Sequence, residues 1–158
     1  MSVGYVVTLG FADVPDPGVS AACGKILRMV DHAIEALHGV DFSLWRFSVS
    51  LHGCMVSIPS GKFEDVRLFV DALADKKTIA PPSLRVAVAW GDVAPVDIRG
   101  SKNFEGYPAI AGARLVPKLP AGSLAYHPPD QFNENDLNGV TLDIFDGKRG
   151  EKFPAFVR

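Results

Sequence analysis

The order of apolar patterns along the chain is the feature that most constrains its fold. A short β-branched strand pattern at Tyr5–Leu9 precedes a helical pattern that ends near His38. Ser43–Ile58 contains two strand patterns, Lys62–Ala74 a second helical pattern and Leu84–Trp90 an alternating strand. A hairpin between helices is incompatible with strict strand–helix alternation. This order therefore predicts a mixed or antiparallel sheet with helices packed on one face.

The remaining segments add shorter elements to this core. Asp92–Gly106 is polar with little periodicity, so we expect an irregular connection there. A short helix is expected at Ala109–Leu119, followed by strands at Ser123–Tyr126 and Phe153–Val157. The predicted fold class is thus α+β, a ferredoxin-like βαββαβ core with a short α-β-β C-terminal extension. The length favours one domain over residues 1–158.

Composition excludes several classes of protein. Hydrophobic residues make up 47% and charged residues 22%, which indicates an ordinary globular chain. Lys plus Arg is 16 against 18 for Asp plus Glu, so no basic face for nucleic acid is expected. No apolar run reaches the roughly 18 residues of a membrane span, and the first residues lack a secretory pattern. We therefore expect a cytoplasmic protein. Cys23 and Cys54 lack metal or redox spacing and are expected to be buried thiols.

Five segments, in order, resemble the catalytic domain of class III adenylyl/guanylyl cyclases. Thr8–Val14 resembles the first strand of that family, and Ser48–Met55 lies where the family has a Gly-Asp-Gly hairpin. Leu84–Asp92 is similar to the family's "RVGIHTGE" strand and turn. Gly106–Gly122 resembles its "GDAVNLAARLE" helix, and Phe145–Val157 its closing hairpin. The resemblance covers nearly the whole chain.

The resemblance implies a metal site that this chain reproduces only in part. Nucleotide cyclisation uses two metal ions held by carboxylates. Asp13 matches the first metal-binding Asp, whereas His52 stands in place of the second. Because Mg²⁺ prefers oxygen ligands, His52 suits it poorly. Mg²⁺ or Mn²⁺ at Asp13, or Zn²⁺ or Mn²⁺ between both residues, stays open, and no cofactor is established. By itself, Asp13 also fits a strand-end acid that caps the next turn, and His52 also fits a hairpin turn in a surface loop.

The resemblance also implies nucleotide-binding positions. Arg114 matches the Arg that contacts phosphate, but Ile110 replaces the Asn that donates a hydrogen bond to the transition state. Ser48 and Asn103 occupy the two purine-reading positions without reproducing the residues of the family. Arg114 is also compatible with an exposed helix residue, and Asn103 with a turn residue.

These departures fall on chemical positions, while scaffold positions such as Gly91, Gly106 and Leu115 are kept. We therefore expect a catalytically degenerate cyclase-homology domain, acting as a regulatory nucleotide-binding or protein-interaction module. The enzyme alternative is an atypical nucleotide cyclase that uses Asp13 and His52 with Arg114 for any residual catalysis. A third reading is an assembly module without a ligand.

The resemblance further implies a partner, because the family pairs two such domains head to tail. We expect a homodimer or a heterodimer with another cyclase-type domain. Three aromatic residues, Trp45, Phe47 and Phe104, are candidates for an exposed patch that pairs.

Overall fold

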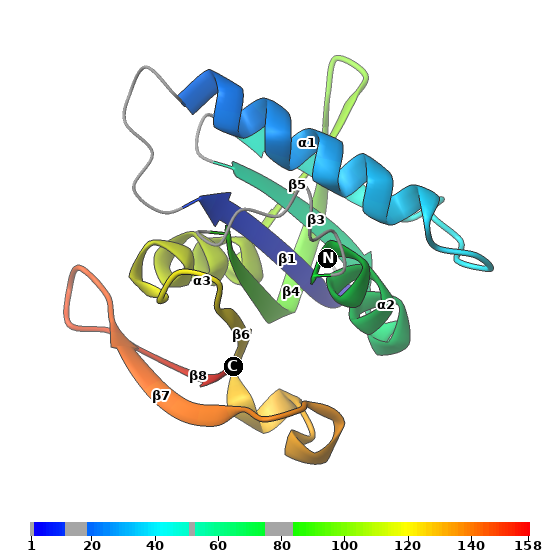
Figure 1. The fold of residues 1–158 in the computed structure, drawn as a ribbon. Helices are drawn as coiled ribbons and strands as arrows, with labels where there is room; N and C mark the ends of the chain where they lie inside the picture. Colours follow the sequence, from blue (N-terminus) through cyan, green and yellow to red (C-terminus); the bar gives the residue numbers. More distant parts are fainter. Residues whose placement is uncertain (1, 12–18, 51–52, 75–83) are drawn as a thin grey trace.

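The computed structural model describes residues 2–11, 19–50, 53–74 and 84–158 (Figure 1). The core elements, in chain order, are β1 (Ser2–Phe11), α1 (Val19–Glu35), β2 (Arg46–Ser50), β3 (Gly53–Pro59), α2 (Phe63–Ala74) and β4 (Leu84–Ile98). The later elements are β5 (Ser101–Gly106), α3 (Tyr107–Leu115), the 3-10 turn η2 (Val116–Lys118), β6 (Leu124–His127), the 3-10 turns η3 (Pro129–Gln131) and η4 (Glu134–Asp136), β7 (Thr141–Asp146) and β8 (Lys152–Val157). The predicted α+β class is confirmed.

The described strands form a sheet in the order β2-β3-β1-β4-β6-β8-β7, with β5 paired to β4 outside this path. β1 is antiparallel to both neighbours, and Val7 lies opposite Val56 of β3 and Val88 of β4. This is the strand order of a ferredoxin-like βαββαβ core. β6 runs parallel to β4, with Val88 opposite Tyr126, so the sheet is mixed as predicted.

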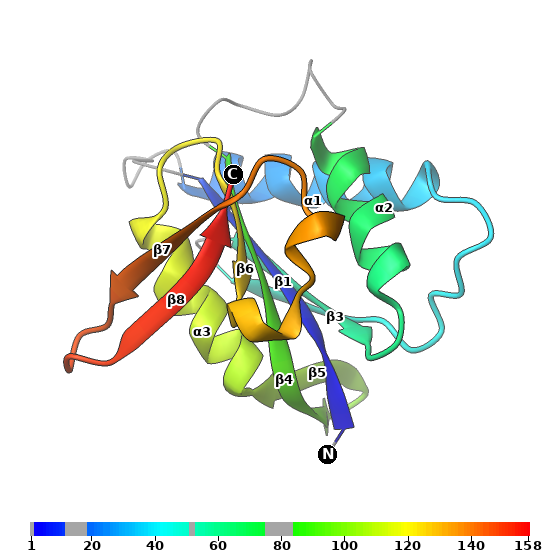
Figure 2. The ribbon, with the colours of Figure 1, turned by 90° about the horizontal axis from the view of Figure 1, so that it is seen from below.

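Alternation along β1 sends side chains into two separate layers. Tyr5, Val7 and Leu9 are buried in the core that includes residues of α1 and α2. Val6 and Thr8 point to the opposite face, where Thr8 lies against α3 at Gly112. The two core helices thus share one face, and α3 covers the other (Figure 2). Our expectation of helices on one face holds for the core and fails for the C-terminal extension.

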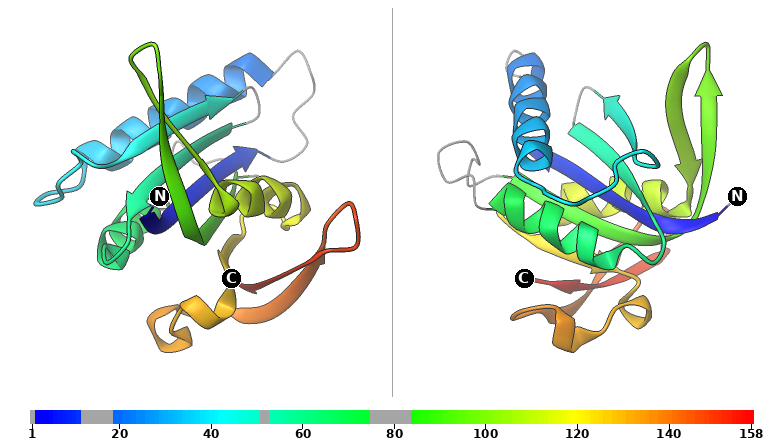
Figure 3. Two further views of the ribbon diagram at one scale, coloured as in Figure 1. Left: turned by 180° about the vertical axis from the view of Figure 1, so that it is seen from behind. Right: turned by 90° about the vertical axis from the view of Figure 1, so that its right-hand side faces the viewer.

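The expectation of an irregular segment at Asp92–Gly106 is wrong. β4 continues to Ile98, turns through Arg99 and Gly100, and returns as β5 in an antiparallel hairpin. The turn needs the left-handed backbone that these residues adopt, with φ of 50° and 85°. Figure 3 shows the hairpin as an arm that leaves the sheet. A strand pair that leaves a sheet lacks a steadily buried face, so no apolar alternation revealed it.

The aromatic patch is also corrected by the structure. Trp45 and Phe104 are only 5% and 8% exposed, whereas Phe47 is 39% exposed. Trp45 packs edge-on against Phe69 of α2, and Phe104 packs in a small cluster on the α3 face. Trp45 and Phe104 therefore fill space beside the helices, and of the three aromatic residues Phe47 alone is exposed.

Within the described segments, no helix is long and apolar enough to cross a membrane. Cys54 is buried, as predicted. The side chain of Cys23 falls outside the described residues.

Candidate functional site

Helix α3 is held tightly on its inner side. Ala111 and Leu115, four residues apart, are fully buried against the sheet. Gly112 lies so close to β1 that a Cβ atom there would come within 2.1 Å of Thr8 Oγ1. With this side fixed, the same periodicity turns Ile110 and Arg114 away from the sheet.

An open pocket of about 630 Å³ lies on that outer side, between the end of α3 and the turn that joins β7 to β8. Its lining residues are Ile110, Ala113, Arg114, Pro117, Lys118, Gly147 and Lys148. Three of these seven residues are cations, although the chain as a whole has a net charge of −2. The pocket therefore offers a local positive surface that the composition does not suggest.

The three cations differ in what they already bind. Half-buried Arg114 makes no hydrogen bond or ion pair with any residue that the structure describes, so its five donors are free for a ligand. The ammonium of Lys118 donates to the backbone carbonyl of Asp146, which leaves two of its three donors. Lys148 is exposed at the turn. Such donors suit phosphate oxygens.

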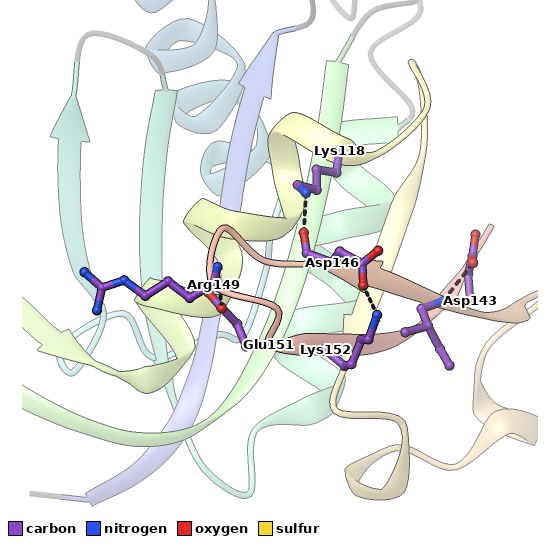
Figure 4. A network of polar contacts seen from close by, with 7 residues as sticks. Lys118, Asp143, Asp146, Arg149, Glu151 and Lys152 are labelled. Carbon is purple, nitrogen blue, oxygen red and sulfur yellow. Dashed lines mark hydrogen bonds and ion pairs between the residues drawn. The ribbon is translucent and has the colours of Figure 1, made fainter.

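Polar contacts hold the turn that carries Lys148 (Figure 4). Lys152 forms an ion pair with Asp146, and this hydrogen bond keeps the pKa of the Asp146 carboxyl below its usual value. The amide of Arg149 donates to Glu151 Oε2 over 2.8 Å. Backbone hydrogen bonds, followed by the charge of Arg114, lower the pKa of Glu151. Both carboxylates thus stay ionised around neutral pH, and Glu151 is a nearby negative charge that Arg114 feels.

The two predicted purine-reading positions lie on other strands of the sheet. Ser48 is on β2 opposite Met55, and Asn103 is on β5 of the arm. Arg46, two residues before Ser48, donates to the Asn103 carbonyl over 2.9 Å and to Asp97 over 2.7 Å. β2 and the arm therefore face each other here. Neither Ser48 nor Asn103 lines the pocket of Arg114.

The predicted metal residues, Asp13 and His52, lie outside the described residues. The metal site therefore stays a prediction from the sequence. Within the described segments, no group of three His, Cys, Asp or Glu side chains could hold a metal ion.

Lys118 and Lys148 were missed by the sequence analysis. Lys118 follows Arg114 by four residues, a helical spacing that would have placed both on one face. Lys148 lies in the glycine-flanked segment Gly147–Gly150, a typical turn. Their convergence could not be found by spacing alone, because it requires the β7–β8 hairpin to fold back beside α3.

Comparison with known proteins identifies the fold. No family model and no curated protein sequence matches the chain. Among solved structures, an adenylate/guanylate cyclase/hydrolase from Silicibacter pomeroyi is similar, with a TM-score of 0.66 and 13% identity over 98% of this chain and 95% of that one. The guanylate cyclase domain of RhGC from Catenaria anguillulae, solved with GTP, has a TM-score of 0.64 and 10% identity over 99% and 95%. A dimeric guanylyl cyclase domain from Blastocladiella emersonii has a TM-score of 0.62 and 12% identity over 99% and 96%.

The chain therefore has the fold of class III adenylyl/guanylyl cyclase catalytic domains, as its sequence segments predicted. The likeness extends over nearly the whole chain. At 10 to 13% identity it establishes the fold, and function has to be argued from the site.

Proposed function

We propose that this chain is a cyclase-fold module that binds the phosphate groups of a nucleotide and has no efficient cyclase activity. The observation that carries this proposal is the pocket of about 630 Å³ where Arg114, Lys118 and Lys148 converge from two elements. Free guanidinium and ammonium donors around an open pocket favour an anion with several oxygens. A domain that binds a nucleotide without converting it can act as a regulatory module, because binding alone is then the signal.

Ile110 is the reason why we expect no efficient turnover. This side chain is 56% exposed and lines the pocket beside Arg114. In the resembled family an Asn at this position donates a hydrogen bond to the negative charge that develops on the phosphate oxygens in the transition state. Isoleucine has no donor, and loss of one such donor typically costs about 3 to 4 kcal/mol in the barrier. Ser48 and Asn103 support base binding more weakly, since Asn103 Oδ1 already accepts from the Phe104 amide at 2.9 Å.

A second cyclase-type domain is the partner that we propose. The guanylyl cyclase domain from Blastocladiella emersonii, similar in fold, is described as dimeric. Ile110 at the pocket and Ile98 at the arm tip are more than half exposed. Apolar side chains at such positions are consistent with a covering domain. A cytoplasmic location is part of the proposal, because that is where a nucleotide ligand is available, and cell fractionation tests it.

The test is calorimetric titration with pyrophosphate, GTP and ATP, each with and without Mg²⁺ or Mn²⁺. Arg114→Ala is expected to weaken binding by about 2 kcal/mol, near 30-fold, because it removes charge-assisted hydrogen bonds. Arg149→Ala is the matched control. It removes the same charge from an exposed side chain near the pocket that does not line it, and binding should change little.

Chromatography of the same mixtures reads out catalysis. We expect no cyclic nucleotide above the uncatalysed background. Cyclic product that disappears in Asp13→Ala would favour the atypical cyclase instead. Equal affinities of the wild type and Arg114→Ala would remove Arg114 from the site, and no heat with any of the ligands would favour a protein-interaction module.

A further inference from the structure

His127 is a buried titratable residue that the proposed function leaves unused. It ends β6, is 2% exposed, and has both ring nitrogens in short hydrogen bonds. Nδ1 lies 2.6 Å from the carbonyl oxygen of Pro154 in β8. Nε2 lies 2.7 Å from the hydroxyl of Tyr107, the first residue of α3. One imidazole thus joins the two elements that carry the pocket.

The chemistry of the partners determines the protonation of the neutral ring. A carbonyl oxygen only accepts hydrogen bonds, so Nδ1 must carry the proton and donate it to Pro154. Nε2 is then the acceptor, and the Tyr107 hydroxyl donates to it. Burial raises the pKa of Tyr107, which keeps this donor protonated. In the neutral state, both ring nitrogens of His127 therefore have a matching partner, the Tyr107 hydroxyl as a donor and the Pro154 carbonyl as an acceptor.

These hydrogen bonds and a second contact join the segment of α3 and η2 to the hairpin of β7 and β8 at two points. At the other end of the same segment, Lys118 of η2 donates to the Asp146 carbonyl at the end of β7. The pocket residues Ile110 and Arg114 lie between Tyr107 and Lys118 in the helical segment. Apolar packing of Ala111 and Leu115 with Phe153 and Ala155 closes the space underneath. Two polar ties thus fix the spacing of α3 and the hairpin, and only the tie through His127 contains a group that titrates near neutral pH.

We propose that His127 is a positioning residue that ties α3 to β8 when neutral, and that its protonation loosens this tie and widens the cation pocket. The tie itself is independent of any ligand, whereas its effect on anion affinity rests on the proposed function. The affinity of the pocket for anions would then depend on pH.

The groups around His127 support this direction. Protonation places a charge on a ring that water barely reaches, and it turns Nε2 from an acceptor into a donor that Tyr107 must now meet with its oxygen. Burial accordingly lowers the pKa of His127. The hydrogen bond to Pro154 and the negative charge of Asp130 in η3 both raise this pKa, but their effect is smaller than that of burial. From β8 the ring meets neutral groups, the Pro154 carbonyl and the Phe153 ring. Tyr107 is its titratable neighbour from α3.

The first test needs no ligand. Two-dimensional amide NMR spectra of the full chain are recorded between about pH 5 and 8, together with the imidazole signals of His127. We expect amides of Ala113 in α3 and Lys148 in the turn to shift with the inflection of His127. In Tyr107→Phe the Ala113 amide should no longer follow it. Tyr5→Phe, which loses a hydroxyl on the opposite face of the sheet, should behave as the wild type. The proposal would be overturned if the wild-type amide shifts did not change with pH, or if the Ala113 amide of Tyr107→Phe still followed the titration of His127.

The second test follows the pocket with sulfate, an anion whose charge is constant over this range. Arginine and lysine also keep their charges, so any inflection in affinity must come from another group. Wild-type affinity is expected to fall about three- to tenfold as pH drops through the His127 inflection, while Tyr107→Phe binds weakly without an inflection. A wild-type inflection that persists in Tyr107→Phe would contradict the proposal. Sulfate binding to neither protein at any pH would instead contradict the proposed function, and the amide titration would still decide the role of His127.

Discussion

At the scale of single residues, Gly112 of α3 lies so close to Thr8 of β1 that there is no room for a Cβ atom between them. The missing Cβ lets the helix sit directly on the strand, and Thr8 Oγ1 is buried there without a hydrogen-bond partner among the described residues. That close seating sets how far Arg114 stands from the sheet.

We therefore predict that Gly112→Ala destabilises the protein by about 1 to 3 kcal/mol, because the added methyl group must displace Thr8 or the helix. Chemical denaturation measures the loss. Gly24→Ala in α1 is the matched helical control, since its Cβ would meet only the end of the Arg28 side chain at 3.5 Å. It should gain up to about 1 kcal/mol from helix propensity. Equal effects at the two glycines would contradict the close contact.

His127 predicts a pH dependence of stability whose sign can be worked out. Its folded-state pKa lies below the ordinary value of 6.5, so the unfolded chain binds the proton more readily. The free energy of unfolding should fall as pH drops through about 6.5 and level off below the folded pKa. In His127→Gln this contribution should vanish, leaving a flatter profile. Urea unfolding at a series of pH values measures it, and parallel profiles for the two proteins would contradict the assignment.

At the scale of elements, the arm of β4 and β5 is fastened to β2 by Arg46. One guanidinium nitrogen serves both the exposed carboxylate of Asp97 and the part-buried carbonyl of Asn103. The pKa of Asp97 is lowered, first by this hydrogen bond. Because the Asp97 carboxylate is open to water, the contact with Asn103 should matter more for stability.

Arg46→Ala is accordingly expected to cost about 1 to 2 kcal/mol, since the Asn103 carbonyl loses its donor. Asp97→Ala should cost clearly less. Hydrogen exchange of β5 amides provides the local readout, with faster exchange in Arg46→Ala than in Asp97→Ala. A control is Arg67→Ala in α2, which breaks an exposed pair with Glu64 and should leave β5 unchanged. Faster exchange of the β5 amides in Asp97→Ala than in Arg46→Ala would contradict this prediction and show that the ion pair holds the arm.

At the scale of the whole molecule, one chain presents a pocket that is open on one side, with Ile110 exposed at its edge. Light scattering over a range of concentrations is expected to show the mass rise toward twice the 17.0 kDa of one chain. Ile110→Glu should lower the association, because it places a charge in the surface that we expect to be covered. A constant monomer mass at every concentration would refute self-association and leave the heterodimer as the proposed assembly.

The sequence by itself determined the order of the elements. Apolar alternation at Tyr5–Leu9 and Leu84–Trp90, and helical spacing in α1 and α2, reflect burial against one shared core, so they predicted βαββαβ and the cyclase-like fold. Arg114 was found because it falls in a family-like segment. The arm was missed, since a hairpin that leaves the sheet needs no periodic apolar face.

Only the tertiary structure decided which distant residues meet. Lys118 and Lys148 join Arg114 because β8 pairs with β6 and returns the hairpin beside α3. The same sheet order brings together the hydrogen-bonded residues Tyr107, His127 and Pro154, although 47 positions separate the first from the last. Local patterns report what each segment buries, whereas such contacts depend on the sheet order, which brings together side chains without a shared local signal.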